Sequence, residues 1–330
     1  MHWGDNRILR AAAALLLSFG AGPALAATTW TLIDVGTLGG PGSYGAAISN
    51  SGIVAGCADT AAGPAHAFIY SNGEMHDLGD PGSGQSCALA VNNDGVVAGR
   101  SGTGEIVIWR ASGVTHLGVK GDVGGIDGFG VVVGAIREGT QTTAFKYQNG
   151  TVIPLAGANS TANGINARGQ VVGTANGHAV LYEEGGARDL GTLGGNGSSA
   201  RGINDNGQIV GMAADANGQP QPFLFDAAMH ALPGPGYSGA IAINNRGQVI
   251  GSAEGTHGYL IENGQYTRLD TLPAVVAKGW RRMEPTGIND RGWIVGSAST
   301  PSGDLRAFVL VPAAERARVA SFARVGRGPF

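Results

Sequence analysis

The sequence predicts an all-β protein, a seven-bladed β-propeller of four-stranded blades that is closed by its own N-terminal strand. Three observations lead to this fold class: a motif that recurs seven times, strand-like segments within each recurrence, and one such segment at the start of the chain that the last recurrence lacks. The composition agrees, because 59 of the 330 residues are glycine while the hydrophobic fraction is 43%. Abundant glycine with this apolar content indicates many turns in an ordered fold rather than disorder.

The recurring motif consists of Ile or Val, then Asn, two further residues, Gly, a short apolar run and a second Gly. Its clearest copy begins at Ile203 and ends at Gly211. The first glycine of the copies, repeats 1 to 7 in chain order, is Gly52, Gly95, Gly130, Gly169, Gly207, Gly247 and Gly292. The second glycine follows four residues later in every copy, and neighbouring copies are 35 to 45 residues apart. The Asn position holds Ser49, Asn92, Asp127, Asn166, Asn204, Asn244 and Asn289. A period of this length is typical of repeat architectures and propellers.

Each repeat is expected to form four strands, a to d. Strand a ends at the Ile or Val and strand b is the apolar run, so the N-x-x-G between them is a hairpin turn. Strand c alternates large apolar residues, as at Phe68 and Tyr70, which is the period of a strand. A second turn, often Asn-Gly, leads to strand d and its leucine, for example Leu78. The residue before the Ile or Val is always Ala or Gly, which suits the crowded inner end of a wedge-shaped blade.

The ends of the chain indicate how the repeats close. Repeat 7 ends at Pro312 without a strand d, whereas residues 34–40 near the N-terminus match residues 189–195 of a strand d at every position except Val35, where the later copy has Leu190. A ring completed by its own first strand leaves no extended sheet edge at the chain ends. The alternative is an open β-solenoid, which needs no such exchange and would carry polar end caps.

The repeats resemble those of the HAF-repeat proteins, a family of extracellular bacterial repeat proteins. The resemblance rests on His66-Ala-Phe68 and the related segment at His178, with Gly-Ile-Asn and Asp-Leu-Gly-Thr-Leu-Gly-Gly, and it covers residues 29–311. The signature is degenerate, since Glu105, Thr143, Gln221 and Arg306 stand where other repeats have His. The family implies export and repeats, and no defined reaction.

Three segments divide the chain. Residues 1–26 read as a secretory signal, with Arg7 and Arg10 before an apolar stretch and an A-x-A pattern that ends at Ala26. Residues 27–312 form the propeller, and residues 313–330 a C-terminal tail. The apolar stretch is shorter than the ~20 residues of a membrane-spanning helix. We therefore expect a secreted or periplasmic protein without a membrane span.

Composition and motifs argue against several function classes. The net charge of −3 and only three lysines give no basic stripe for nucleic acid. Metalloprotease, P-loop and serine-hydrolase motifs do not occur, and the G-x-G-x-x-G from Gly234 precedes a strand instead of a helix. The histidines of different repeats would lie far apart in a ring, so no metal site is expected. The sequence accordingly predicts no catalytic residue, no cofactor and no metal.

Three functions stay open. The first is a non-catalytic binding module in the envelope or outside the cell, whose partner is a glycan, a peptide or an envelope protein. The second is an envelope hydrolase or lyase that uses the propeller pocket, because propeller enzymes can assemble paired carboxylates from different blades. The third is a passive structural or matrix component.

Two further expectations concern particular side chains. Cys57 and Cys87 are expected to form a disulfide because exported cysteines are usually paired, the alternative being two buried thiols. The loops from strand d to the next strand a are expected to bind any ligand, because variable loops on a rigid scaffold often do. Aromatic and basic residues in these loops could stack on a sugar ring or hold a carboxylate. They are Tyr44, Tyr237, Trp280, Arg281 and Arg282. The alternative is that these rings pack the loops onto the rim.

Overall fold

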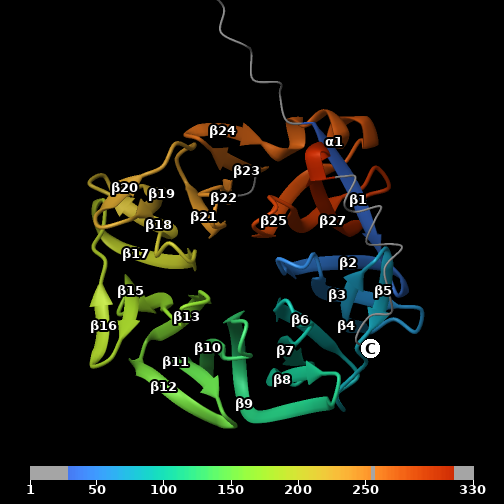
Figure 1. Ribbon diagram of the computed structural model, residues 1–330, viewed down its shortest axis with the longest axis horizontal. Coiled ribbons are helices and arrows are strands. Elements are labelled where there is room, and N and C mark those ends of the chain that lie inside the picture. The colour runs from blue at the N-terminus through green and yellow to red at the C-terminus, as the bar shows by residue number, and fades with distance from the viewer. Residues whose placement is uncertain (1–28, 254–256, 316–330) are drawn as a thin grey trace, which may run out of the picture.

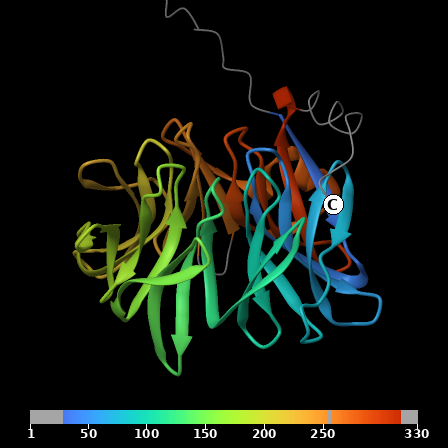
Figure 2. The ribbon, with the colours of Figure 1, turned by 60° about the horizontal axis from the view of Figure 1, so that its bottom comes forward.

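The computed structural model describes residues 29–253 and 257–315. Within these residues the protein consists of antiparallel β-sheets with one short α-helix and two short 3-10 helices. The sheets are arranged around a common centre (Figure 1), and their strands run between the two faces of the molecule (Figure 2). The predicted signal, residues 1–26, lies outside the described residues, as do residues 316–330 of the tail. No helix in the described part is long and apolar enough to cross a bilayer.

Repeats 1, 4, 5 and 6 each form one four-stranded sheet from consecutive strands. In repeats 1 and 4 the strands are β2 (Gly39–Ile48), β3 (Val54–Thr60), β4 (Ala65–Ser71), β5 (Glu74–Asp77), β13 (Ser160–Ile165), β14 (Val171–Ala175), β15 (His178–Glu183) and β16 (Gly186–Asp189). In repeats 5 and 6 they are β17 (Gly194–Ile203), β18 (Ile209–Asp215), β19 (Pro220–Phe225), β20 (Met229–Ala231), β21 (Ser238–Ile243), β22 (Val249–Ala253), β23 (His257–Glu262) and β24 (Gln265–Arg268). These strands follow the predicted order a to d.

Repeats 2 and 3 differ from the expectation because they share one strand in a seven-stranded sheet. Its strands are β6 (Ser86–Val91), β7 (Val97–Ser101), β8 (Glu105–Arg110), β9 (Gly113–Ile126), β10 (Val132–Glu138), β11 (Gln141–Gln148) and β12 (Thr151–Ala158). The first half of β9 pairs with β8 and its second half with β10. Gly95 and Gly130 are only 35 residues apart, the shortest spacing in the chain, so strand d runs straight into the next strand a without a loop.

The last sheet joins the two ends of the described chain. It contains β25 (Arg281–Ile288), β26 (Ile294–Ser299), β27 (Leu305–Pro312) and the first strand, β1 (Trp30–Gly36), in the order β1-β27-β26-β25. Strand β1 is antiparallel to β27 in a register from Trp30 opposite Pro312 to Gly36 opposite Ala307. The segment before β25 contains η1 (Leu269–Thr271) and α1 (Pro273–Lys278), where the sequence predicts only an irregular loop, and η2 (Ala313–Glu315) follows β27.

The two glycines of the motif recur for two different reasons. The first glycine of each repeat has a φ between +74° and +92°, a conformation that other residues rarely adopt. The second glycine is required by space, because strand a bulges where it passes strand b. A Cβ atom on Gly56 would overlap the carbonyl oxygen of Tyr44 and the ring of Phe68, and the other six copies are equally close to the facing strand. The spacing of the two glycines therefore follows from the positions of the turn and of the bulge.

In five of the seven repeats, an aromatic ring of strand c lies at the centre of the packed sheet. Phe68, Phe145, Phe223, Tyr259 and Phe308 are completely buried. Four of these rings lie directly over the second glycine of their own repeat, at Gly56, Gly134, Gly211 and Gly251. The missing side chain of the glycine thus makes room for the aromatic ring, which fills the sheet interface at normal packing density.

The recurring Asn holds its own turn and also contacts the next repeat. Oδ1 of Asn204 accepts the main-chain N–H groups of Asn206 and Gln208 at 3.1 and 2.9 Å. Its Nδ2 donates to the main-chain oxygen of Asn244 in repeat 6 at 3.0 Å. The turn role follows from the sequence, but the bond between repeats does not.

The same bond between repeats recurs along the chain and across its ends. It is donated by Asn92, Asn166, Asn204, Asn244 and Asn289. Asn289 in repeat 7 donates to the main-chain oxygen of Ser49 in repeat 1 at 3.0 Å. Ser49 and Asp127 have no amide group to donate, so repeats 1 and 3 lack this donor.

We expect Asn204→Ala to lower the free energy of unfolding by about 1–3 kcal/mol, because it leaves buried main-chain groups of two repeats without partners. Urea denaturation measures the effect. The matched control is Asn217→Ala, which removes an exposed Asn side chain from a hairpin and should stay within ~0.5 kcal/mol of the parent protein. Equal effects of the two substitutions would show that the hydrogen bonds of Asn204, within its own turn and to repeat 6, contribute nothing.

In the structure Cys57 of β3 and Cys87 of β6 are joined by a disulfide bond between the sheets of repeats 1 and 2. The bond closes a segment of 30 residues. Its removal by the double substitution Cys57→Ser and Cys87→Ser is expected to destabilise the protein by about 3–4 kcal/mol in the chain-entropy model. Thiol labelling of the denatured, unreduced protein should find no free thiol, and two reactive thiols without reductant would refute the bond.

Candidate functional site

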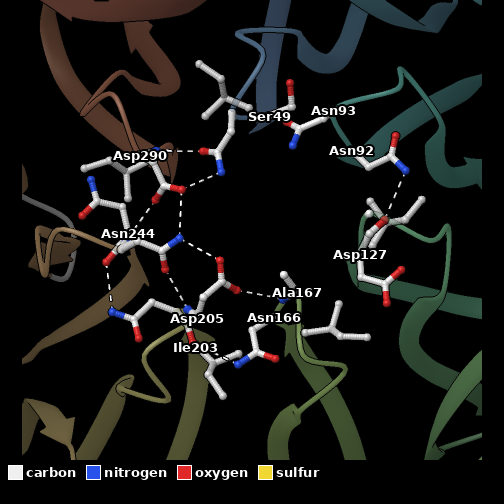
Figure 3. Close-up of a pocket in the computed structure, with 18 of the residues that line it drawn as sticks. Ser49, Asn92, Asn93, Asp127, Asn166, Ala167, Ile203, Asp205, Asn244 and Asp290 are labelled. Atoms are coloured by element: carbon white, nitrogen blue, oxygen red, sulfur yellow. Dashed lines mark hydrogen bonds between the residues drawn. The ribbon is translucent and has the colours of Figure 1, made fainter.

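A cavity of about 250 Å³, here called the turn cavity, lies among the turns between strands a and b (Figure 3). Asn245 Nδ2 donates to the carboxylates of both Asp205 and Asp290, at 2.7 and 2.9 Å. The second oxygen of each carboxylate accepts a main-chain N–H, from Ala167 and from Asn245, at 2.8 Å. The two carboxylates are thus held by amide donors and link one repeat to the next, which is a structural role.

A larger cavity of about 450 Å³, the central cavity, adjoins the turn cavity and is lined by strand a of all seven repeats. The two cavities share the Ile or Val of the motif, at Ile48, Val91, Ile126, Ile165, Ile203, Ile243 and Ile288. The small residues that precede them also line the central cavity, as expected for the inner end of each sheet. They are Ala47, Ala90, Gly125, Gly164, Gly202, Ala242 and Gly287. Most of the residues in this wall are therefore aliphatic or small.

A third cavity of about 410 Å³, the side cavity, adjoins the central cavity and shares Ile241 and Thr286 with it. Four titratable side chains from three repeats line it: Tyr44 of β2, His257 of β23, and Arg282 and Glu284 of β25. One phenol, one imidazole, one guanidinium and one carboxylate converge there, so a bound molecule could be held by both donors and acceptors.

The environment changes the titration of two of these groups. Partial burial raises the pKa of Tyr44, and the nearby Glu284 carboxylate raises it further. Burial lowers the pKa of His257, and the charge of Arg268 acts in the same direction. His257 Nε2 also lies 2.6 Å from the hydroxyl of Tyr266. Both shifts favour the neutral forms, so Tyr44 and His257 act as neutral hydrogen-bonding groups at neutral pH.

The side cavity brings together only two of the five ligand-binding residues that the sequence predicts. Tyr44 and Arg282 line it, whereas Tyr237 and Arg281 do not. Tyr237 is 55% exposed in the loop before β21, and Arg281 is exposed at the start of β25.

Trp280 is not an exposed ligand-binding ring as expected from the sequence, because its indole is only 7% exposed and packs in a hydrophobic cluster. Its neighbours in the cluster include Leu32, Val275 and Met283. Helix α1 folds the 273–285 segment onto β1 and thereby turns the indole inward. Trp280 is thus a packing residue, which agrees with the alternative that the rings pack the loops onto the rim.

The histidines of the repeats pair within their own sheets. Nδ1 of His66 lies 3.0 Å from Asp77, and Nδ1 of His178 lies 2.7 Å from Asp189. The N–H of Gly191 lowers the pKa of Asp189, and His178 contributes in the same direction. The HAF-like His and the Asp of Asp-Leu-Gly are therefore partners on strands c and d, a link that the sequence analysis missed.

Repeat 2 carries this pair in reverse, with Glu105 on strand c and His116 on strand d, 3.1 Å apart. The hydrogen bond from His116 lowers the pKa of Glu105. Among residues 29–253 and 257–315, no three His, Cys, Asp or Glu side chains gather closely enough to hold a metal ion.

No family model and no curated protein matches the sequence. Among solved structures, an acylaminoacyl peptidase from Pyrococcus horikoshii is similar with 10% identity and a TM-score of 0.45 over 75% of this chain and 48% of the peptidase. This chain thus spans about half the length of that protein.

Two other solved structures are similar over most of both chains. A putative oxidoreductase (glucose dehydrogenase) from Thermus thermophilus has 11% identity and a TM-score of 0.36, over 86% of this chain and 100% of the other. A mutant of the Aleuria aurantia lectin, in complex with alpha-methyl-L-fucoside, has 9% identity and a TM-score of 0.37, over 86% and 95%. All three TM-scores are below 0.5, so these similarities carry no argument about fold or function.

Proposed function

We propose that this chain is an exported, non-catalytic binding protein with the fold of a seven-bladed β-propeller. In this fold β1 is the fourth strand of the last blade. Two contacts between the chain ends support closure: the pairing of β1 with β27, and the hydrogen bond from Asn289 to Ser49. The lining of one central cavity by all seven repeats supports the number of blades.

The observation that carries the binding function is the side cavity. Its polar groups come from three repeats and converge beside a central cavity that is lined mainly by aliphatic and small residues, and many ligand pockets combine such groups in this way. Arg282 has a φ of +51°, unusual for a residue with a side chain. Such conformations concentrate at binding and active sites, where the surrounding structure maintains them.

The proposed location is the periplasm or the cell exterior, and the proposed family is the HAF-repeat proteins. The signal-like residues 1–26 and the disulfide between Cys57 and Cys87 support export, because disulfides persist in oxidising compartments. The ligand is proposed to be a glycan, a peptide or an envelope protein, since a site with one carboxylate, one guanidinium and two neutral donors suits hydroxyl, amide and charged groups.

A glycan and peptide array with residues 27–330, run beside a hydrolase and lyase screen, tests this function. Arg282→Asn and Tyr44→Phe should weaken binding of an array hit by about tenfold. Asn is chosen because it tolerates a positive φ. The matched controls Arg281→Asn and Tyr237→Phe alter residues outside the side cavity and should leave the affinity unchanged.

Two outcomes would contradict the proposal. Turnover of a compound in the screen, lost in Glu284→Gln, would show an enzyme. Equal losses of affinity in the side-cavity variants and in their controls would place the binding site elsewhere.

A further inference from the structure

Among the described residues that line the central cavity, Arg201 of β17 is the only charged one. The corresponding position, two residues before the Ile or Val of the motif, is uncharged in every other repeat. It holds Ala46, Leu89, Gly124, Asn163, Ile241 and Thr286. These six residues differ from one another in size and polarity, so the charge is what distinguishes Arg201 from them.

The fold provides a defined place for the Arg201 side chain. Arg201 is half-buried, and its guanidinium extends toward β21 of the next repeat. A Cβ atom on Gly239 of β21 would lie 3.3 Å from Nη1 of Arg201 and 3.6 Å from Sδ of Met212. Gly239 thus leaves room for the guanidinium between the inner strands of repeats 5 and 6.

No anionic partner balances this charge. In the described part of the chain Arg201 makes no ion pair and no side-chain hydrogen bond. The titratable group that acts on it most is Tyr259, whose own pKa is raised by burial, so the phenol is neutral at neutral pH. A guanidinium stays protonated even when burial lowers its pKa, and a half-buried charge without an ion-pair partner is less favourable than one in open water. A bound anion would remove that penalty.

We propose that the central cavity binds a monocarboxylate with an apolar body. The carboxylate accepts two parallel hydrogen bonds from the Arg201 guanidinium, the geometry that this group favours. The apolar body lies against the ring of Ile and Val side chains, for example Ile203 and Ile243. The volume of about 450 Å³ is that of a small-molecule pocket. This inference goes beyond the proposed function, because it concerns the central cavity and not the side cavity. The source of its ligand is a free organic acid or the carboxyl terminus of an apolar peptide.

Calorimetric titration of residues 27–330 tests the inference with four probes. These are decanoate below its micelle concentration, uncharged decanamide, a capped apolar tripeptide with a free carboxyl terminus, and the same tripeptide amidated. At least one acid should bind about 10- to 100-fold more tightly than its amide, as expected for charged hydrogen bonds. Binding of decanoate alone would identify a free acid, and binding of the tripeptide acid a peptide terminus.

Arg201→Met should remove this preference for the acid, and Arg201→Lys should retain part of it. The control Arg246→Met removes the same charge from an exposed position and should leave the preference intact. Comparison of acid with amide on the unchanged protein stays decisive if Arg201→Met fails to fold. Equal affinity for acid and amide, no saturable binding of either acid, or an undiminished preference in folded Arg201→Met would overturn the inference. The array experiment on Arg282 and Tyr44 would still stand by itself, so failure here is distinguishable from failure of the proposed function.

Discussion

A chain that begins at Gly39, and so lacks β1, should be largely unfolded at room temperature. Strand β1 supplies every hydrogen bond on one side of β27, and it buries Leu32 and Val35, which are 3% and 5% exposed. Each of these side chains contributes to a different hydrophobic cluster. Loss of one such side chain costs about 2–5 kcal/mol. Loss of both, together with the hydrogen bonds of the strand, is comparable to the whole free energy of unfolding of many domains, which is about 5–15 kcal/mol.

Circular dichroism during thermal unfolding measures this effect against the chain that begins at Ala27. Leu32→Ala in the complete mature chain should lower the free energy of unfolding by about 2–5 kcal/mol, an intermediate loss. A truncated chain with an unchanged melting temperature would mean that β27 does not depend on β1.

Trp280→Ala should be the most damaging single substitution in the segment between η1 and β25. The indole is 7% exposed and connects α1 to β1 and β27 through one cluster that includes Val275, Leu32 and Leu310. Truncation of a buried Trp costs about 3–5 kcal/mol, which corresponds to a decrease of roughly 10 °C in the melting temperature for a domain of this size. Thermal unfolding of the variant measures it.

The adjacent Arg281 provides the matched control, because it is exposed. Arg281→Ala should change the free energy of unfolding by no more than ~0.5 kcal/mol. If Trp280→Ala left the melting temperature unchanged but abolished binding of an array hit, the indole would be a ligand contact after all.

The strand plan could be predicted from the sequence because the motif records backbone geometry directly. The first glycine of each repeat marks a positive φ, and Asn72 followed by Gly73 has φ values of 54° and 86°, as a two-residue hairpin turn requires. The long strand β9 and the helix α1 were not predicted. Strand β9 forms where the connection between strands d and a is shortest, and α1 forms in a longer connection of the same kind. These connections share no recurring sequence motif, so the repeat does not predict their structure.

The contacts between repeats were the main feature of the fold that the sequence did not predict. The Asn of the motif is explained by its own turn, so nothing in the sequence indicates that its Nδ2 also reaches the next sheet, as from Asn204 to Asn244. The pairing of His178 with Asp189 is similar, because the two residues belong to motifs that look independent until strands c and d are aligned.

The candidate site was harder to predict than the fold, because its residues come from repeats that are distant in the sequence. Tyr44 and Arg282 were found as irregular residues in loops, and they line one cavity. Trp280 met the same criterion but is buried, since a sequence does not show which way an aromatic ring turns. Arg201 lies in strand a, where a search restricted to loops does not look. A signal was nevertheless present, since it is the one charged residue among seven equivalent positions.

A circular permutant tests closure of the proposed propeller most directly. The main-chain N–H of Ala313 donates to the oxygen of Thr29 at 2.7 Å, so a short Asn-Gly turn can join these ends. The permutant contains residues 39–313, the turn and then residues 29–37, which makes β1 an ordinary strand d after β27. It should fold with the same circular dichroism spectrum as the mature chain and a melting temperature within about 5 °C of it, while residues 39–313 alone should not fold. A permutant as unstable as residues 39–313 alone would contradict closure by β1.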